Sequence, residues 1–216
     1  MRNLALSVLF AAALPSTMAQ AHPHIFVTVE VTLIYENNAP VAVRLAWVYD
    51  DYFSLLITSD LGLDLDGDMV LTPDEKLTLS ASVTEWPADF GGDLVVMQGD
   101  DLVQLAPRIN HEMTFEDGIM REIHTRPFVA ELGDDDPITI RVYDPFYYVA
   151  YDLAGTVTIE GRDDCEAMVT PANLDAAYTL VEELLYGRPA NDVGPDELFP
   201  EVGVAFADTI EVTCVE

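Results

Sequence analysis

Residues 24–36, which read His-Ile-Phe-Val-Thr-Val-Glu-Val-Thr-Leu-Ile-Tyr-Glu, decide the fold. One face of this stretch carries the apolar side chains Ile25, Val27, Val29, Val31, Leu33 and Tyr35, and the other face carries Thr28, Glu30, Thr32 and Glu36. Strict alternation of this kind is typical of a β-strand with one buried face. Residues 37–40 predict a turn, and the β-branched and aromatic run 41–49 predicts a second strand. We therefore expect an antiparallel hairpin with one half-exposed sheet face.

The pattern becomes helical after this hairpin. Asp50 is a suitable N-cap for a helix that ends near Gly62. A second helix is predicted from about Pro73 to Trp86, because proline favours the first turn of a helix. A carboxylate-rich loop joins the two helices.

Short strands and one further helix are expected in the rest of the chain. The predicted strands are roughly 93–98, 101–106, 110–116, 119–131, 138–143, 147–152, 156–161 and 208–215. Asp117-Gly118 is a strong hairpin signal, residues 172–186 have helical apolar spacing, and residues 187–197 predict a loop. The sequence thus predicts one α+β domain over residues 22–216, built mainly on antiparallel sheet, with a C-terminal helix.

The acidic loop has the most specific motif in the chain. Residues 64–75 place Asp64, Asp66 and Asp68 at loop positions one, three and five, the carbonyl of Val70 at seven, and Glu75 at twelve. This spacing matches an EF-hand calcium loop, which surrounds a hard cation with oxygen ligands, and predicts an EF-hand-like insertion at about 50–86. Position six departs from the pattern, because Met69 stands where glycine favours a positive φ. We therefore expect weak calcium binding, with an acidic turn that holds no metal as the alternative.

The net charge excludes whole classes of partner. Lysine and arginine total 9 against 39 acidic residues, which gives a formal net charge of −30. Such a surface repels phosphate backbones and anionic lipids, so we expect neither nucleic-acid binding nor a polybasic membrane anchor. Cations are the natural partners, although an acidic shell that only keeps the protein soluble would have the same composition.

Residues 1–21 resemble a secretory signal peptide. Arg2 precedes the apolar run 4–14, and Ala19-Gln20-Ala21 is a small-x-small cleavage signal. The apolar run is too short to span a bilayer, and no later apolar run is long enough, so no membrane insertion is expected. We expect an exported, periplasmic protein that is cleaved after Ala21.

Cleavage at this position would begin the mature chain at His22-Pro23-His24. A free α-amine and two imidazoles are borderline nitrogen donors for zinc or nickel, so His22 and His24 are candidate ligands. Frayed terminal histidines with no metal are the alternative. His111 and His124 are equally distant from the Asp117-Gly118 turn, which would place them nearly opposite each other. They could join the terminal pair in one transition-metal site, or they could be ordinary surface or core histidines.

Two cysteines fit an oxidising compartment. Cys165 and Cys214 are the only cysteines in the chain, and an exported protein with an even number favours one disulfide between them. Two buried free thiols are the alternative. Their spacing does not fit a redox motif or a zinc knuckle.

Five segments, in order, resemble the periplasmic family known as domain of unknown function 1007. They are residues 22–27 (HPHIFV), 47–53 (WVYDDYF), the loop 64–75, 142–149 (VYDPFYYV) and 208–214 (DTIEVTC). The resemblance spans nearly the whole mature chain. It implies a component of an uncharacterised transport system, associated with a nickel/cobalt-type membrane permease and with zinc or nickel handling. Met69 replaces the glycine usual in the family's acidic loop.

We therefore expect a periplasmic metal-binding accessory protein of a divalent transition-metal (zinc, nickel or cobalt) transport system, with a structural calcium loop and a membrane permease as partner. The alternative is a calcium-stabilised protein-interaction module with no part in transition-metal transport. A copper site with redox activity at the terminal histidine is a third hypothesis. No nucleophile elbow, phosphate-binding glycine loop or His-Glu-x-x-His helix occurs, so an enzyme is not expected.

Overall fold

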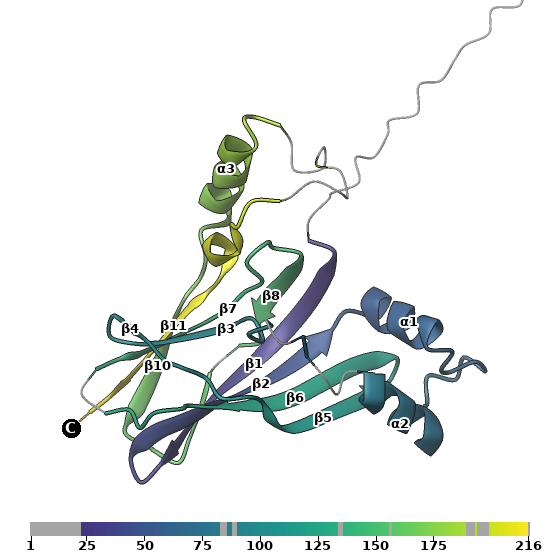
Figure 1. Ribbon diagram of the computed structural model, residues 1–216, viewed down its shortest axis with the longest axis horizontal. Coiled ribbons are helices and arrows are strands. Elements are labelled where there is room, and N and C mark those ends of the chain that lie inside the picture. Colours follow the sequence, from purple (N-terminus) through teal and green to yellow (C-terminus); the bar gives the residue numbers. More distant parts are fainter. Residues whose placement is uncertain are drawn as a thin grey trace, which may run out of the picture.

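The computed structural model of the protein describes residues 23–82, 86–87, 90–133, 136–155, 157–188, 193 and 199–215. Within these residues the chain forms two mostly antiparallel sheets and three α-helices (Figure 1). The predicted α+β class is confirmed.

The first sheet contains the hairpin that opens the chain. Its strands are β1 (Ile25–Glu36), β2 (Ala39–Tyr49), β5 (Ile109–Glu116), β6 (Ile119–Pro127), β8 (Val149–Leu153) and β9 (Thr158–Glu160). Their order is β5-β6-β2-β1-β8, and β9 also pairs with β1. Pairing is antiparallel except at β1, where β8 and β9 run parallel to it. The central position of β1 agrees with the alternation from which it was predicted.

The second sheet is smaller and contains the end of the chain. Its strands are β3 (Leu94–Gln98), β4 (Asp101–Leu102), β7 (Ile138–Val142), β10 (Cys165–Thr170) and β11 (Thr209–Cys214), in the order β10-β11-β7-β3-β4. Cys165 and Cys214 lie opposite each other in the β10–β11 register and form a disulfide. The predicted bridge is therefore present.

The main hydrophobic core lies between the two sheets. Leu33, Val43 and Leu45 of the first sheet and Val96 and Ile140 of the second are each fully buried in one cluster. Burying an aliphatic side chain of this size stabilises the fold by about 1.5–3 kcal/mol. The apolar face predicted for β1 is thus the face that packs on the second sheet.

Both predicted hairpin turns have the backbone that a tight turn requires. Asn37 and Asn38 join β1 to β2 with φ of 51° and 67°, and Asp117 and Gly118 join β5 to β6 with φ of 51° and 82°. Two consecutive residues with positive φ match the right-handed twist of the flanking strands.

Two of the helices follow β2, and the third precedes the last strand. They are α1 (Asp51–Asp60), α2 (Pro73–Ser82) and α3 (Leu174–Leu184). α1 contacts β6 and α2 contacts β5, at one end of the first sheet (Figure 1). α3 packs on a short 3-10 helix, Gly203–Phe206, through Ala177 and Val181. No helix among the described residues is long and apolar enough to cross a membrane.

Several predicted boundaries differ from the structure. α2 is described as far as Ser82, and residues 83–85, over which the predicted helix would continue toward Trp86, lie outside the described residues. The strand predicted over 101–106 is only two residues long, followed by an isolated bridge from Leu105 to Phe128. β10 was not predicted, because the residues that it turns toward the core, Cys165, Ala167 and Val169, are small and only half-buried.

Candidate functional site

Local packing fixes the acidic loop between α1 and α2. The Asp50 side chain caps α1 by accepting a hydrogen bond from Phe53 N at 2.8 Å. Leu63 and Leu71, at the two ends of the loop, are buried in a small cluster with residues of β5 and β6. These two anchors hold both ends of the loop against the first sheet.

The three aspartates that were predicted as ligands converge. Oxygen atoms of Asp64, Asp66 and Asp68 all lie within 4.8 Å of one another, with Asp64 half-buried and the other two exposed. Two oxygens that each lie roughly 2.4 Å from a calcium ion are separated by at most roughly 4.8 Å. The spacing therefore fits a single calcium-sized cation.

Glu75, predicted as the bidentate ligand, also caps α2. Its Oε2 accepts hydrogen bonds from Thr72 N at 2.8 Å and from Thr72 Oγ1 at 2.7 Å, and its Oε1 accepts from Asp64 N at 3.0 Å. Glu75 N in turn donates to Thr72 Oγ1 at 3.4 Å, which completes a capping box. The hydrogen bonds from Thr72, followed by that from Asp64, hold the pKa of Glu75 below its ordinary value.

Met69 adopts the backbone conformation expected of the sixth loop position. Its φ is 61°, and its N–H donates to both carboxylate oxygens of Asp64, at 3.2 and 3.3 Å. A methionine in this left-handed region costs on the order of 1 kcal/mol or more. The next residue, Val70, donates its N–H to Asp68 Oδ1 at 2.8 Å. The Met69 side chain reaches Gly118, so that a Cβ at Gly118 would lie 3.3 Å from its sulfur.

His24, the described member of the terminal pair, lies apart from His111 and His124. His22 is outside the described residues, and the exposed His24 donates its N–H to the carbonyl of Tyr148 at 2.8 Å, with the two rings 4.6 Å apart. In the sheet register His124 lies two strands across from Val31. Seven residues of strand from His24 to Val31 span about 23 Å. The structure therefore does not bring His24 together with His124.

His111 and His124 lie close together, as their equal distance from the Asp117-Gly118 turn predicted. His111 Nε2 lies 3.4 Å and His124 Nδ1 lies 3.5 Å from the same oxygen, Oε1 of Glu122. Glu122 is 2% exposed, and neither imidazole has a hydrogen-bond partner for these nitrogens among the described residues. Burial lowers the pKa of both histidines, against the opposing effect of the Glu122 charge, and favours the neutral rings.

Arginine rather than histidine balances the charge of Glu122. Arg108 Nη1 lies 2.5 Å from Glu122 Oε1, and Tyr49 Oη donates to Oε2 at 3.2 Å. The guanidinium carbons of Arg108 and Arg126 lie 4.2 and 5.6 Å from the ring centre of Trp86. Two guanidinium groups disfavour a divalent cation at the Glu122 and histidine cluster.

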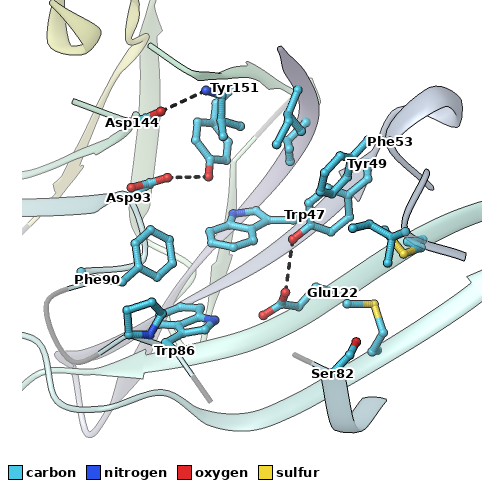
Figure 2. A pocket seen from close by; sticks show the side chains of 18 of the residues that line it. Trp47, Tyr49, Phe53, Ser82, Trp86, Phe90, Asp93, Glu122, Asp144 and Tyr151 are labelled. Carbon is cyan, nitrogen blue, oxygen red and sulfur yellow. Dashed lines mark hydrogen bonds between the residues drawn. The ribbon is translucent and has the colours of Figure 1, made fainter. Parts of the chain in front are cut away.

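A cavity of about 790 Å³ lies between the end of the first sheet, α1 and residues 86–87 and 90–93 (Figure 2). Its aromatic lining residues are Trp47, Tyr49, Phe53, Trp86, Phe90, Phe146 and Tyr151. Its acidic lining residues are Asp60, Asp93, Glu122 and Asp144. No lysine, arginine or histidine is among the described residues that line it. Its volume is that of a small-molecule site.

Asp93 is the most perturbed carboxyl group in the cavity wall. Its Oδ2 accepts a hydrogen bond from Tyr151 Oη at 2.8 Å, as Figure 2 shows. Burial raises the pKa of Asp93 from 3.8 to about 7, the hydrogen bond from Tyr151 opposes the shift, and the Asp144 charge adds to it. Burial likewise raises the pKa of Tyr151 well above its ordinary value, which keeps the hydroxyl protonated as the donor.

The cavity residues were not predicted from the sequence. Met120, Glu122, His124 and Arg126 alternate along β6 and are all buried. In a sequence, charged side chains at alternate positions normally indicate the solvent face of a strand. The signal that could have revealed the site is the combination of this charged alternation with two nearby tryptophans, which are the only two in the chain.

Comparisons with known proteins bear on the family alone. A search of curated proteins finds no match to the chain. A family model described as a protein of unknown function, DUF1007, matches residues 7–214. This match confirms the resemblance predicted from the five segments. Because it covers nearly the whole chain, the protein belongs to the DUF1007 family.

Proposed function

We propose that this protein is an exported accessory protein of a divalent-metal transport system, and that its loop 64–75 is an EF-hand-like calcium site. The observation that carries the proposal is the convergence of the Asp64, Asp66 and Asp68 carboxylates within 4.8 Å. A hard cation of calcium's size would replace the mutual repulsion of these carboxylates with direct ligation.

The remaining ligands would come from the same loop. The Val70 carbonyl and the Glu75 carboxylate are the expected ligands at positions seven and twelve. To bind calcium in the bidentate mode, Glu75 would exchange at least part of its hydrogen bonding to Thr72 for the ion. Together with the left-handed Met69, this competition supports an affinity in the range of about 10⁻⁴–10⁻³ M, that of extracellular modules.

The transport role has separate support. His22 and His24, with the new α-amine, would hold zinc or nickel at the mature terminus in the periplasm, and a membrane permease would receive the ion. His24 is exposed at the start of β1, where a partner could reach it. The family resemblance supports the transition metal, and the net charge of −30 would concentrate cations near the surface.

Thermal unfolding with and without calcium tests the loop. Millimolar calcium should raise the melting temperature of the wild type, because the ion binds the folded state. Glu75→Gln should abolish most of this rise, whereas Met69→Gly should enlarge it by relaxing the backbone at φ 61°. Asp74→Asn is the matched control, because it also replaces a carboxylate with an amide in the first turn of α2, but at loop position eleven, which supplies no ligand. It should lower the melting temperature in EDTA but keep the calcium response. A wild-type curve unchanged by calcium, with no response in Met69→Gly, would show that the loop is only an acidic turn.

A specific observation favours the second candidate, a calcium-stabilised interaction module. α1 buries Ser54 and Thr58 against the sheet and exposes Tyr52, Leu55 and Leu56. The exposed fractions of these three side chains are 69%, 65% and 42%. An apolar helix face turned to solvent beside a calcium loop is the arrangement expected of a protein-docking surface. Transition-metal titration of the processed protein separates the candidates, because the interaction module would bind calcium but neither zinc nor nickel.

A further inference from the structure

The cavity described above has an unbalanced negative charge. Of its acidic lining residues, Glu122 is paired with Arg108, and Asp144 accepts hydrogen bonds from three backbone N–H groups of residues 146–149. Among the described residues, the neutral Tyr151 hydroxyl is the side-chain partner of the Asp93 carboxyl group, and no basic side chain forms an ion pair with it. A half-buried carboxyl group without a basic partner favours a ligand that brings a positive charge.

Aromatic rings surround the same space. The Trp47 ring lies 5.7 Å from Tyr151 and 5.9 Å from Trp86, and Phe90 packs edge-on against Trp86 at 4.9 Å. Figure 2 shows Asp93 on the same side of the cavity as Tyr151 and Phe90. Aromatic faces attract cations through the ring quadrupole, most strongly where water is excluded.

We propose that this cavity binds an organic cation, an amine or quaternary ammonium compound with an apolar body, whose charged end lies between the Asp93 carboxylate and the rings of Trp47 and Tyr151. The apolar body would fill the remaining volume against α1 and β1. The proposal goes beyond the loop cation and does not depend on it.

A metal ion fits this cavity less well than an organic cation does. Among the described residues, the only three metal-ligating side chains whose ligand atoms gather within 4.8 Å are Asp64, Asp66 and Asp68, and none of these lines the cavity. Calcium or magnesium needs several hard oxygens, whereas one carboxylate among aromatic rings is the chemistry that recognises an ammonium group. An anion would face four acidic side chains with no basic lining residue among those described.

Intrinsic fluorescence gives a direct assay, because Trp47 and Trp86 are the only tryptophans in the chain and both line the cavity. The purified full chain in EDTA, which empties the acidic loop, is titrated with benzyltrimethylammonium at about pH 8, above the pKa of about 7 of Asp93, so that its carboxyl group is ionised. Its neutral carbon isostere, neopentylbenzene, and the anion phenylacetate are titrated in parallel. We expect saturable binding of the cation, at least tenfold weaker binding of the neutral isostere, and no binding of the anion.

Asp93→Asn should weaken binding of the cation at least tenfold and leave the affinity for the neutral isostere unchanged. Asparagine tolerates the positive φ of 51° at this position and can still accept the Tyr151 hydrogen bond, so the variant should fold. Asp152→Asn is the matched control, since it removes the same charge from an exposed position on β8 and should not change the affinity. Four outcomes would each overturn the proposal. The wild type could bind the cation and its isostere equally, bind the anion preferentially, or fail to bind the cation at about 10 mM. Asp93→Asn could also bind the cation as tightly as the wild type does. Absence of a calcium response in the loop would not contradict the proposal for the cavity.

Discussion

Replacing Asp93 with asparagine should change how the stability of the fold depends on pH. The pKa of Asp93 is raised from 3.8 to about 7 in the folded protein. Below about pH 3 the carboxyl group is protonated in both states and has no effect. As the pH rises toward 7, the unfolded chain releases the proton while the folded chain retains it, so stability is lost. Each pKa unit corresponds to about 1.4 kcal/mol, so the full shift is worth about 4 kcal/mol.

Asparagine cannot titrate and keeps the neutral form that the buried site favours. Between about pH 5 and about pH 8, the wild type should therefore lose about 3 kcal/mol relative to Asp93→Asn. Half-buried His111 and buried His124 act in the opposite direction, because their lowered pKa values give stability that is present above about pH 6.5 and lost as the pH falls. Both histidines are present in the two proteins, so their effect cancels in the difference.

Urea unfolding at several pH values, followed by tryptophan fluorescence, measures this difference. Asp152→Asn serves again as the control and should track the wild type, because Asp152 is exposed on β8. A constant difference between Asp93→Asn and wild type across this pH range would refute the reasoning. It would mean that Asp93 is ionised in the folded protein at about pH 5, with charge compensation that the geometry does not account for.

Two further perturbations test the buried ion pair and the terminal metal site. Arg108→Met should destabilise the fold by about 3–5 kcal/mol, because it leaves Glu122 buried and charged, and adding Glu122→Gln should recover much of that loss in urea unfolding; full additivity of the two substitutions would argue against a direct pair. Mass spectrometry of protein purified from the periplasm should show a first residue of His22. This protein should bind zinc or nickel in a calorimetric titration, and His24→Ala should lower that affinity at least tenfold. Retention of Ala21 or earlier residues would remove the amine ligand from the proposed site.

The parts of the fold that were predictable are those in which local pattern and tertiary packing agree. The residues of β1 alternate because one face meets the second sheet, so periodicity alone located the strand and its buried side. Asp117-Gly118 located the β5–β6 turn, because few other residues adopt two consecutive positive φ angles. The paired cysteines and the acidic loop were visible for a similar reason, since each depends on residue type and spacing along the chain.

The cavity was not predictable because local pattern and packing disagree there. β6 turns Glu122, His124 and Arg126 inward, where they are stabilised by partners from elsewhere in the chain such as Arg108 and Trp86. α1 similarly buries Ser54, whose Oγ accepts a hydrogen bond from Met120 N at 3.0 Å. Single-sequence periodicity assigns such polar side chains to the surface, because it contains no information about partners distant in the chain. Departures of this kind concentrate at functional sites, and Glu122 is the one of these residues that lines the cavity.

α1 connects the two proposed sites. Phe53, Ile57 and Leu61 line the cavity, and Leu63 and Asp64 follow directly as the buried anchor and the first residue of the acidic loop. A cation that ties the end of α1 to α2 would therefore hold one wall of the cavity in place. Any change that calcium makes in the affinity of the cavity for its ligand must be matched by an equal change that the ligand makes in the affinity of the loop for calcium. Measuring both affinities around this cycle distinguishes a coupled pair of sites from two independent ones, because independent sites show no change in either.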